Sequence, residues 1–333
     1  MCEGNMYVGV DLHKGQFAVT CMDADGLELW RHRYEIDSVS EFARRLDYRH
    51  HVVVEPVENC YWFIGQLGEG VGTVHVANPS RVRLIAESRL KNDRIDSRIL
   101  ADLLRVGYLP EVHIPSEDIQ CWRRLVSHRV VMVRDRARYK HRLRGLIGRE
   151  GFRVRAKDIL GRSGRAALAD LPLPTEVREM VDRQIALADL VTAQLAPIDA
   201  EIERLGRSDE VVRRLTTIDG IKWFTGLAIR STVDRMDRFK SYKAFAAYTG
   251  LVPSYRQSGE TTHTGGITKQ GSRLLRWTLL QAVPHACRRN EYLRRMYSRL
   301  CYRSSRGRAR VAVAHALARI IYHVWMEQRD YYR

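Results

Sequence analysis

Several features that mark whole classes of protein are missing from this sequence. It contains no run of the roughly 18 to 20 uninterrupted apolar residues that a membrane-spanning helix needs, so we expect no membrane association. The six cysteines form no Cys-x-x-Cys pair, which gives no support for a zinc ribbon or a dithiol redox motif. The phosphate-binding loop of nucleotide-driven motors is absent. The first residues do not follow the basic-then-apolar pattern of a signal peptide, and we therefore expect a cytoplasmic protein.

Negative charge is scarce relative to positive charge. The 333 residues include 56 Lys and Arg against 39 Asp and Glu, a net charge of +17, so a polyanion is the first partner to consider. The excess lies mainly in segments 121–150 and 288–310, each with a net charge of +8, whereas residues 1–115 are net negative. Such one-sided runs favour contact with a phosphate backbone, although charge alone does not distinguish DNA from RNA.

The first 115 residues alternate short β-rich runs with helical runs. Tyr7–Met22 and the run from Leu27 predict a three-stranded meander, because β-forming stretches there are separated by turn residues. The other expected elements are a helix at 39–46, a strand at 52–54, a helix at 61–67 and a strand at 73–77. Strands that alternate with helices are typical of an α/β layer fold, and the 45% hydrophobic content is enough for ordinary cores.

Two long helices are predicted next. In residues 118–147 one stripe recurs at steps of three, four and seven: Trp122, Leu125, Met132, Tyr139, Leu143 and Leu146. In residues 175–205 a seven-residue repeat predicts a coiled-coil seam, with a kink at Pro197; its members are Val181, Ala188, Leu195 and Ile202. The seam has two interpretations that the sequence leaves open: packing against the preceding helix, or oligomerisation.

The remainder, 209–333, is predicted to be helix-rich with one polar loop at 254–271. Within that loop Ser258-Gly259 is typical of a turn, and Thr261 and Thr262 offer equally good hydroxyl groups. The residues of the loop alone therefore select no nucleophile.

Four acidic residues occupy positions where carboxylates can gather. Asp11 and Glu55 each end an apolar strand, and Asp93 and Asp96 share a face if a helix begins there. Such a set can hold two divalent ions ~3.5 to 4 Å apart for in-line phosphoryl transfer, and hard oxygen ligands select Mg²⁺ or Mn²⁺. The structural alternative is that Asp93 and Asp96 stabilise the start of the expected helix, and that Asp11 and Glu55 are turn residues. The four together favour the metal site, because an acidic residue directly closes an apolar strand twice.

These motifs, in this order, resemble a known protein family. One set resembles the RuvC-like DEDD domain of the transposases of the IS110 family of insertion sequences: Val8–Asp11, Val52–Glu55, His75–Ser80 and Lys91–Ala101. A second set looks like that family's other conserved domain: Phe245–Pro253, Ser258-Gly259 and Gly266–Arg276. The resemblance extends over nearly the whole chain.

The resemblance implies a fold and a division into domains. It implies an α/β RuvC-like (RNase H-like) N-terminal domain at 1–115, a long basic helix and coiled-coil region at 116–208, and a mostly α-helical domain at 209–333. It also implies a bacterial enzyme, related to Piv-type DNA invertases, that is nucleoid-associated when bound to DNA.

The resemblance further implies site residues and partners. The family's acidic tetrad falls on Asp11, Glu55, Asp93 and Asp96, and its serine nucleophile falls on Ser258. This implies Mg²⁺-dependent or Mn²⁺-dependent strand cleavage through a covalent phosphoserine, guided by a structured non-coding bridge RNA that pairs with donor and target DNA. We expect a homo-oligomer, a dimer or tetramer, and no histidine ligand; His13 and His263 are accessory candidates.

The segment Leu215–Ile221 stands where relatives usually carry an Ile-Pro-Gly-Ile-Gly hairpin, whose turn amides bind phosphate. Here Asp219 replaces the proline and Lys222 the second glycine, so Lys222 is expected to contact phosphate by charge. A plain turn between helices that packs Trp223 and Phe224 is the alternative. The residues expected to bind nucleic acid are Arg134, Arg138, Lys140, Arg142, Lys222, Lys269, Arg273, Arg294 and Arg295.

The predicted function is an RNA-guided DNA recombinase that excises and inserts its own element. One alternative is a junction-resolving metal nuclease, in which the tetrad activates water and Ser258 is structural. The other is a non-catalytic nucleic-acid-binding protein that uses the same basic surfaces.

Overall fold

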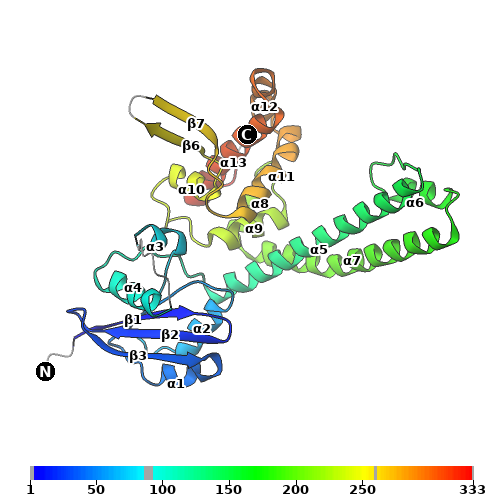
Figure 1. Ribbon diagram of the computed structural model, residues 1–333. Helices are drawn as coiled ribbons and strands as arrows, with labels where there is room; N and C mark the ends of the chain where they lie inside the picture. The colour runs from blue at the N-terminus through cyan, green and yellow to red at the C-terminus, as the bar shows by residue number, and fades with distance from the viewer. Residues whose placement is uncertain (1–3, 86–92, 259–260, 332–333) are drawn as a thin grey trace. The chain divides into compact units, whose positions relative to one another are not determined.

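The computed structural model describes residues 4–85, 93–258 and 261–331, without the side chains of 80, 84, 93–96, 255–258 and 261–264 (Figure 1). The chain divides into two compact units, one that ends at Ile114 and one that begins at Pro115. Each unit has hydrophobic clusters of its own.

The first unit is built on a five-stranded mixed sheet in the order β3-β2-β1-β4-β5. The strands β1 (Met6–Leu12), β2 (Gln16–Met22) and β3 (Glu28–Glu35) are antiparallel neighbours, which confirms the predicted meander. The strands β4 (His50–Val54) and β5 (Thr73–Val76) run parallel to β1. β1 is therefore the central strand, with β2 on one side and β4 on the other.

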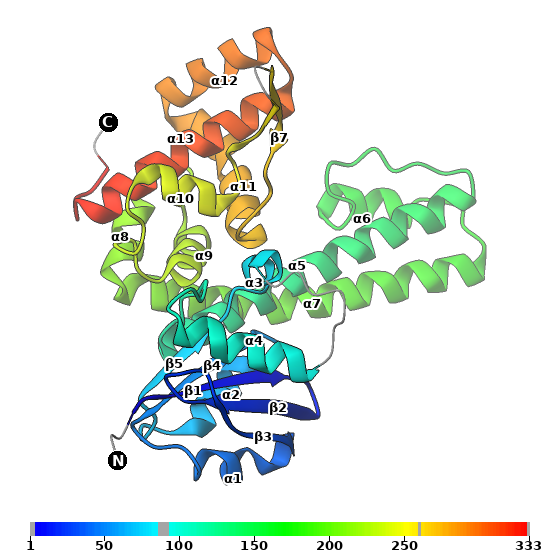
Figure 2. The ribbon, with the colours of Figure 1, turned by 60° about the vertical axis from the view of Figure 1, so that its left-hand side comes forward.

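Helices cover both faces of this sheet. On one face α1 (Val39–Ala43) and α2 (Cys60–Leu67) enclose an apolar cluster that contains the fully buried rings of Phe17, Phe42 and Phe63. On the opposite face lies α4 (Asp93–Arg105) (Figure 1; Figure 2). Two short helices complete the unit: η1 (Ile36–Ser38) and α3 (Pro79–Ile85).

Gly9 allows α4 to lie directly on the central strand. A Cβ built on Gly9 would lie 1.9 Å from the carbonyl oxygen of Ser97 and 2.7 Å from the amide nitrogen of Ala101, so any larger residue would overlap the helix backbone. Thr20, which pairs with Gly9 across the ladder, shares a buried hydrogen bond of 2.9 Å between its hydroxyl and that of Ser97. The close approach and the hydroxyl pair together fix where α4 crosses the sheet.

Two contacts fix the direction of α4. Ser97 lies over Gly9, in the middle of β1, and Arg105 donates from Nη1 to the carbonyl oxygen of Ala24 at 3.1 Å. Ala24 follows β2 and stands beside the amino end of β1, because Tyr7 pairs with Met22. The helix therefore runs antiparallel to β1, and its first turn lies toward the carboxyl end of that strand.

The second unit contains a long antiparallel helical hairpin. It is formed by α5 (Glu117–Arg149) and α7 (Thr175–Ser208), with the short α6 (Arg162–Ala169) near its tip (Figure 1). All four predicted seam residues of α7 are buried and α7 packs against α5, which confirms the first interpretation of the seam. α7 continues through Pro197 as one helix.

The predicted stripe on α5 is only partly right. Leu143 is buried as expected, but the other buried positions are Ile119, Val126, Val130 and Ile147. α5 packs against α7 and also against α9 (Trp223–Val233). Its apolar side chains therefore contact two helices and do not lie along one stripe.

The rest of the second unit is a helical bundle. Its helices besides α9 are α8 (Glu210–Thr216), α10 (Tyr242–Thr249), α11 (Arg273–Arg289), α12 (Glu291–Arg303) and α13 (Arg306–Met326). α13 supplies the largest share of the core, with Val313, Leu317 and Ile321 fully buried.

Within the described parts of the chain, no helix combines the length and apolarity needed to cross a membrane. The boundary expected at 208/209 stays a prediction.

The predicted polar loop at 254–271 is wrong over most of its length. β6 (Pro253–Ser258) and β7 (Thr261–Ile267) form an antiparallel hairpin in which Ser258 pairs with Thr261. The hydroxyl of Ser254 donates to the carbonyl oxygen of Gly266 at 2.9 Å. Because these strands are polar, they lack the alternation of apolar residues that predicts a strand from the sequence. Backbone pairing stabilises them instead.

Replacing Gly9 by alanine is expected to destabilise the first unit, because the added methyl group would overlap the Ser97 carbonyl oxygen and push α4 off the sheet. Overpacking of this kind typically costs about 1 to 3 kcal/mol of unfolding free energy. Urea denaturation followed by circular dichroism measures the change. Gly15→Ala is the matched control, since a Cβ there meets no atom within 4 Å. Equal unfolding midpoints for the two variants would contradict the close approach of α4.

Candidate functional site

Asp11 and Glu55 lie side by side at the carboxyl ends of two parallel strands. Val10 pairs with Val54, so Asp11 on β1 is level with Glu55, the residue that follows β4, and the Glu55 amide donates to the Val10 carbonyl oxygen at 3.1 Å. Neighbouring strands are about 4.8 Å apart. Because side chains alternate along a strand, both carboxylates belong to the face that includes Gly9, which is the face that α4 covers.

Asp11 is buried within this edge of the sheet. It is 2% exposed, and the Nε2 atom of His13 lies 3.3 Å from its Oδ2 atom. A buried carboxylate needs polar neighbours, and His13, which is about half-exposed, supplies one. His13 is thus in contact with the predicted site residue, as its position in the sequence suggested.

Asp93 and Asp96 stand in the first turn of α4, where a helical backbone places residues three apart on one face. The direction of α4 brings this turn toward the carboxyl ends of β1 and β4. The side chains of both residues lie outside those that the structure describes. The backbone therefore brings all four acidic segments to one edge of the sheet, and the described side chains of the site are those of Asp11 and Glu55.

The donor set suits a hard divalent cation. Carboxylate oxygens are the ligands that Mg²⁺ and Mn²⁺ prefer, and two of them are adjacent here. Among the residues with described side chains, no group of three or more His, Cys, Asp or Glu could hold a metal ion. The α4 aspartates are needed to complete such a group.

Ser258 is the last residue of β6, in the second unit. Its side chain lies outside the described residues, as do those of Thr261, Thr262 and His263. The hairpin pairs Ser258 with Thr261, and the choice among the three hydroxyls stays a prediction.

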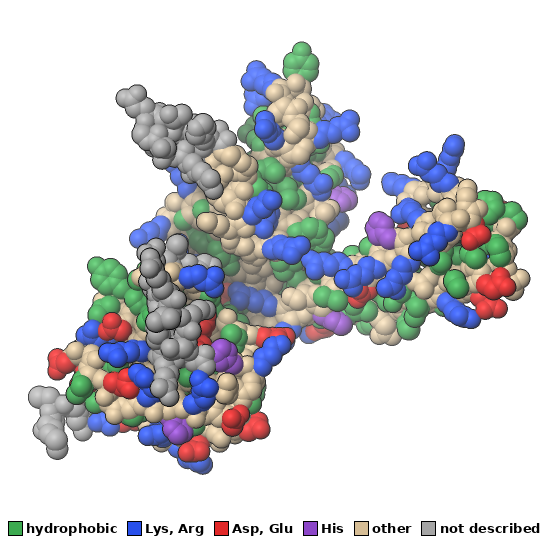
Figure 3. Space-filling view, in the orientation of Figure 1, with side chains coloured by type: hydrophobic (Ala, Val, Ile, Leu, Met, Phe, Trp, Pro, Cys, Tyr) green, Lys and Arg blue, Asp and Glu red, His purple; other side chains and the backbone are tan. Residues whose placement is uncertain are grey.

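The predicted basic face of α5 is partly exposed and partly paired. Arg134 and Arg142 are exposed, and Arg138, also exposed, donates to Asp135 at 2.7 Å. Figure 3 shows Lys and Arg side chains along the hairpin of α5 and α7. Lys140 is only 25% exposed and forms an ion pair of 2.9 Å with Asp158. That hydrogen bond from Lys140 holds the pKa of Asp158 below its usual value. A phosphate would have to compete with Asp158 for Lys140, whereas Arg134 and Arg142 are open to solvent.

The other predicted cations lie on the bundle. Arg294 and Arg295 are exposed on α12, and both contact the Glu291 carboxylate, at 3.6 and 2.7 Å. Lys269 and Arg273 are exposed just before and at the start of α11. One acidic residue thus shares its charge between two arginines, which leaves the surface of α12 basic.

The turn between α8 and α9 fits both interpretations of Leu215–Ile221. Gly220 has a φ of 88°, and a Cβ there would lie 2.6 Å from the Ala286 amide nitrogen, so the turn packs closely on α11. Lys222 is the exposed N-cap of α9, and the first bond within the helix runs from Gly226 to the Lys222 carbonyl oxygen at 2.8 Å. The amide groups before Gly226 are therefore left without helical partners and can bind an anion.

The sequence interpretation missed the supports of the site. Gly9, Thr20 and Ser97 were not predicted to matter, yet they position α4. A usable signal was present for Gly9, because glycine inside an apolar strand often marks close approach of another backbone. Thr20 and Ser97 carry no comparable signal, since their pairing depends on the register of α4.

Two family models match this chain. Residues 8–149 match a model of DEDD-type IS110 transposases, described as a transposase, and residues 212–298 match one described as the transposase IS116/IS110/IS902 family. The first match covers the acidic edge of the sheet and all of α5. The second runs from within α8 to within α12 and includes the β6–β7 hairpin.

Similar proteins carry consistent names. The chain is 25% identical to a probable family 20 transposase of Pseudomonas aeruginosa, over 97% of this chain and 98% of the relative. It is 26% identical to the transposase of insertion sequence element IS1328 of Yersinia enterocolitica, over 86% and 85% of the two chains. It is 23% identical to the transposase of element IS1111A of Coxiella burnetii, over 97% and 90%. The chain belongs to the IS110 family of transposases, which are enzymes of DNA recombination.

Proposed function

We propose that this transposase excises and inserts an insertion sequence by metal-dependent cleavage and rejoining of DNA, with a phosphoserine intermediate and a guide RNA. The observation that carries the proposal is the adjacency of Asp11 and Glu55 on the face that α4 covers, with the turn of Asp93 and Asp96 directed to the same edge. The order of the mixed sheet, an antiparallel meander followed by two parallel strands, supports a RuvC-like fold for this unit.

Four residues would hold the metal: Asp11, Glu55, Asp93 and Asp96. When bound there, Mg²⁺ or Mn²⁺ supplies Lewis acidity for phosphoryl transfer. The protein's own part is to fix the ligands in place. The buried Asp11 is fixed by β1 and by His13, and the start of α4 is fixed by the contact of Gly9 with Ser97.

Ser258 is the proposed nucleophile. Its Oγ–phosphorus bond forms as a deoxyribose oxygen–phosphorus bond of the DNA breaks, the serine proton leaves to a base, and the freed deoxyribose oxygen takes up a proton. Attack by a hydroxyl of another DNA end reverses these changes and joins the new strand, so no high-energy cofactor is consumed. The proposal requires the second unit to reach the acidic edge of the first, within one chain or between chains of a dimer or tetramer.

The basic surfaces are the proposed contacts for donor DNA, target DNA and the bridge RNA. Exposed arginines on α5 and α12, together with Lys222, Lys269 and Arg273, present charge without an equal number of acidic neighbours. Backbone phosphates are their natural counterpart, and base pairing with the guide would supply the sequence choice.

Neutral substitutions in the tetrad are expected to abolish recombination while the fold is kept. Asp11→Asn, Glu55→Gln, Asp93→Asn and Asp96→Asn each remove a ligand charge at nearly constant volume. Strand cleavage by purified protein supplied with Mg²⁺ and guide RNA is the measurement. Asp102→Asn is the matched control on α4, because Asp102 is half-exposed and pairs with Arg105. Near-normal recombination by any two of the four variants would remove the metal-site assignment.

Ser258→Ala is expected to bind RNA and DNA normally but to form no protein–DNA adduct. Peptide mapping of the adduct trapped with the unsubstituted protein should locate the DNA on Ser258. Attachment at Thr261 or Thr262 would show that another hydroxyl attacks. Normal nicking by Ser258→Ala without any adduct would instead favour water as the nucleophile, as in a junction-resolving nuclease.

Replacing Arg134, Arg138 and Arg142 by alanine is expected to weaken nucleic-acid binding and flatten its salt dependence. Each lost phosphate contact lowers the log-log slope by about 0.7 to 0.9, and Arg138 should contribute least because Asp135 already pairs with it. The control replaces Arg183 and Arg204, exposed on α7 and paired with Glu179 and Glu201. A slope that changes no more than in the control would leave the α5 arginines as solvated charge.

A further inference from the structure

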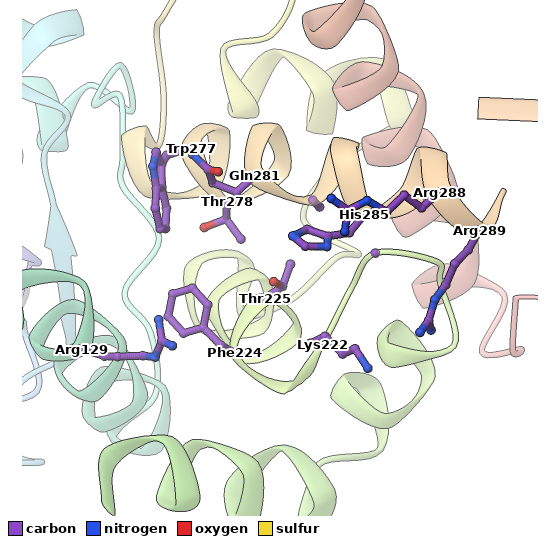
Figure 4. Close-up of a pocket in the computed structure, with 12 residues that line it drawn as sticks. Arg129, Lys222, Phe224, Thr225, Trp277, Thr278, Gln281, His285, Arg288 and Arg289 are labelled. Atoms are coloured by element: carbon purple, nitrogen blue, oxygen red, sulfur yellow. The ribbon is translucent and has the colours of Figure 1, made fainter. Parts of the chain in front are cut away.

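A pocket of about 520 Å³ lies in the second unit, between the start of α9 and one face of α11 (Figure 4). Its walls come from α5, from the turn between α8 and α9, from α9 and from α11. This volume is in the range of small-ligand sites. All of its lining residues belong to one compact unit, so the pocket is defined by a single body of the structure.

One end of the pocket is aromatic. Phe224 and Trp277 meet edge to face, with ring centroids 6.4 Å apart, and both line the cavity. The guanidinium of Arg129 lies 4.1 Å from the centroid of Phe224, and Arg129 is itself held by an ion pair with Asp199. Arg129, which also lines the cavity, therefore holds Phe224 in place, and the two rings offer the cavity apolar surface.

The other end is cationic. Lys222, Arg288 and Arg289 are exposed at this end, and no acidic residue is among the described residues that line the pocket (Figure 4). The N-terminal amide groups of α9, which have no helical partners, lie at the same end, beside Lys222. Charge and amide donors together favour a phosphate group there.

A buried hydroxyl lies between the two ends. Thr278 is 2% exposed and lines the pocket, and its Oγ1 atom has no hydrogen-bond partner among the described residues (Figure 4). A buried hydroxyl is normally satisfied, so this atom indicates a polar group that the pocket receives. Gln281 stands one turn further along α11, and its Oε1 atom accepts from Arg310 at 3.4 Å, which leaves its amide group for a ligand.

We propose that this pocket receives one unpaired nucleotide, with its base against the aromatic end formed by Phe224 and Trp277 and its phosphate at Lys222 and the start of α9. The base edge hydrogen-bonds to Thr278, and stacking on aromatic rings holds bases of any sequence. The inference rests on the proposed nucleic-acid contacts of this unit but requires neither the metal nor Ser258. DNA and RNA share this chemistry, and the test has an arm for each.

The probe is a hairpin duplex with one unpaired 2-aminopurine, made as DNA and as RNA, and titrated with the full chain in EDTA so that no strand is cut. We expect the fluorescence to fall on binding, because the base stacks on the rings, and the hairpin with the unpaired base to bind about tenfold more tightly than its fully paired counterpart. The arm that shows this preference identifies the nucleic acid that the pocket holds.

Variants tie the signal to the pocket. Trp277→Ala should remove the preference for the unpaired base, and Thr278→Val, which keeps the shape of the side chain and the fold, should reduce it. Lys222→Ala should weaken binding and lower the salt slope by about 0.7 to 0.9 without restoring the fluorescence. Lys243→Ala is the control, since Lys243 is exposed on α10 and does not line the pocket.

Three results would overturn the proposal. They are unchanged 2-aminopurine fluorescence in both bound hairpins, equal affinity for paired and unpaired probes, and a Thr278→Val variant that keeps the full preference. Loss of DNA cleavage in the tetrad variants with normal probe insertion would support the pocket separately from the catalytic proposal. Normal cleavage in the tetrad variants would reject the metal site and leave the pocket result standing.

Discussion

The contact between Gly9 and the backbone of Ser97 is the constraint on which the candidate site depends. It brings a helix into direct contact with the central strand, where any Cβ would overlap the Ser97 carbonyl oxygen. The Thr20–Ser97 hydrogen bond fixes the position of the helix, and the bond from Arg105 to Ala24 fixes its direction. Since α4 begins with Asp93, the same packing sets where the backbone of Asp93 and Asp96, two of the four residues of the proposed site, lies.

The sheet positions the other two acidic residues, Asp11 and Glu55. Antiparallel pairing on one side of β1 and parallel pairing on the other make it the central strand, and parallel register with β4 places Asp11 beside Glu55. Carboxylates gathered at one edge repel each other and are costly to bury, and a bound divalent cation would offset that cost. Side chains that would destabilise the fold unless a ligand is bound are typical of functional sites.

The sequence predicted the elements of this chain better than their contacts. The meander and the buried seam of α7 followed from alternation and from a seven-residue repeat, both of which depend on local spacing. The β6–β7 hairpin was missed because its strands are polar and stabilised by backbone pairing. The stripe on α5 was only partly right because two neighbours, α7 and α9, share that helix. The places of Asp11 and Glu55 near strand ends could be predicted from the sequence, and their role in a site stays a prediction. The pocket of Phe224, Trp277 and Thr278 joins helices far apart in the sequence, and no spacing rule indicates it.

The central claim is that the edge of the sheet with Asp11, Glu55 and the start of α4 binds a divalent metal ion. Fe²⁺ can replace Mg²⁺ in oxygen-ligand sites and, with ascorbate and peroxide, cuts the polypeptide backbone close to where it is bound. The account predicts cuts near Asp11, near Glu55 and near Asp93–Asp96 in the full-length protein, suppressed by excess Mg²⁺. Cuts clustered elsewhere, or cuts that excess Mg²⁺ leaves unchanged, would contradict it.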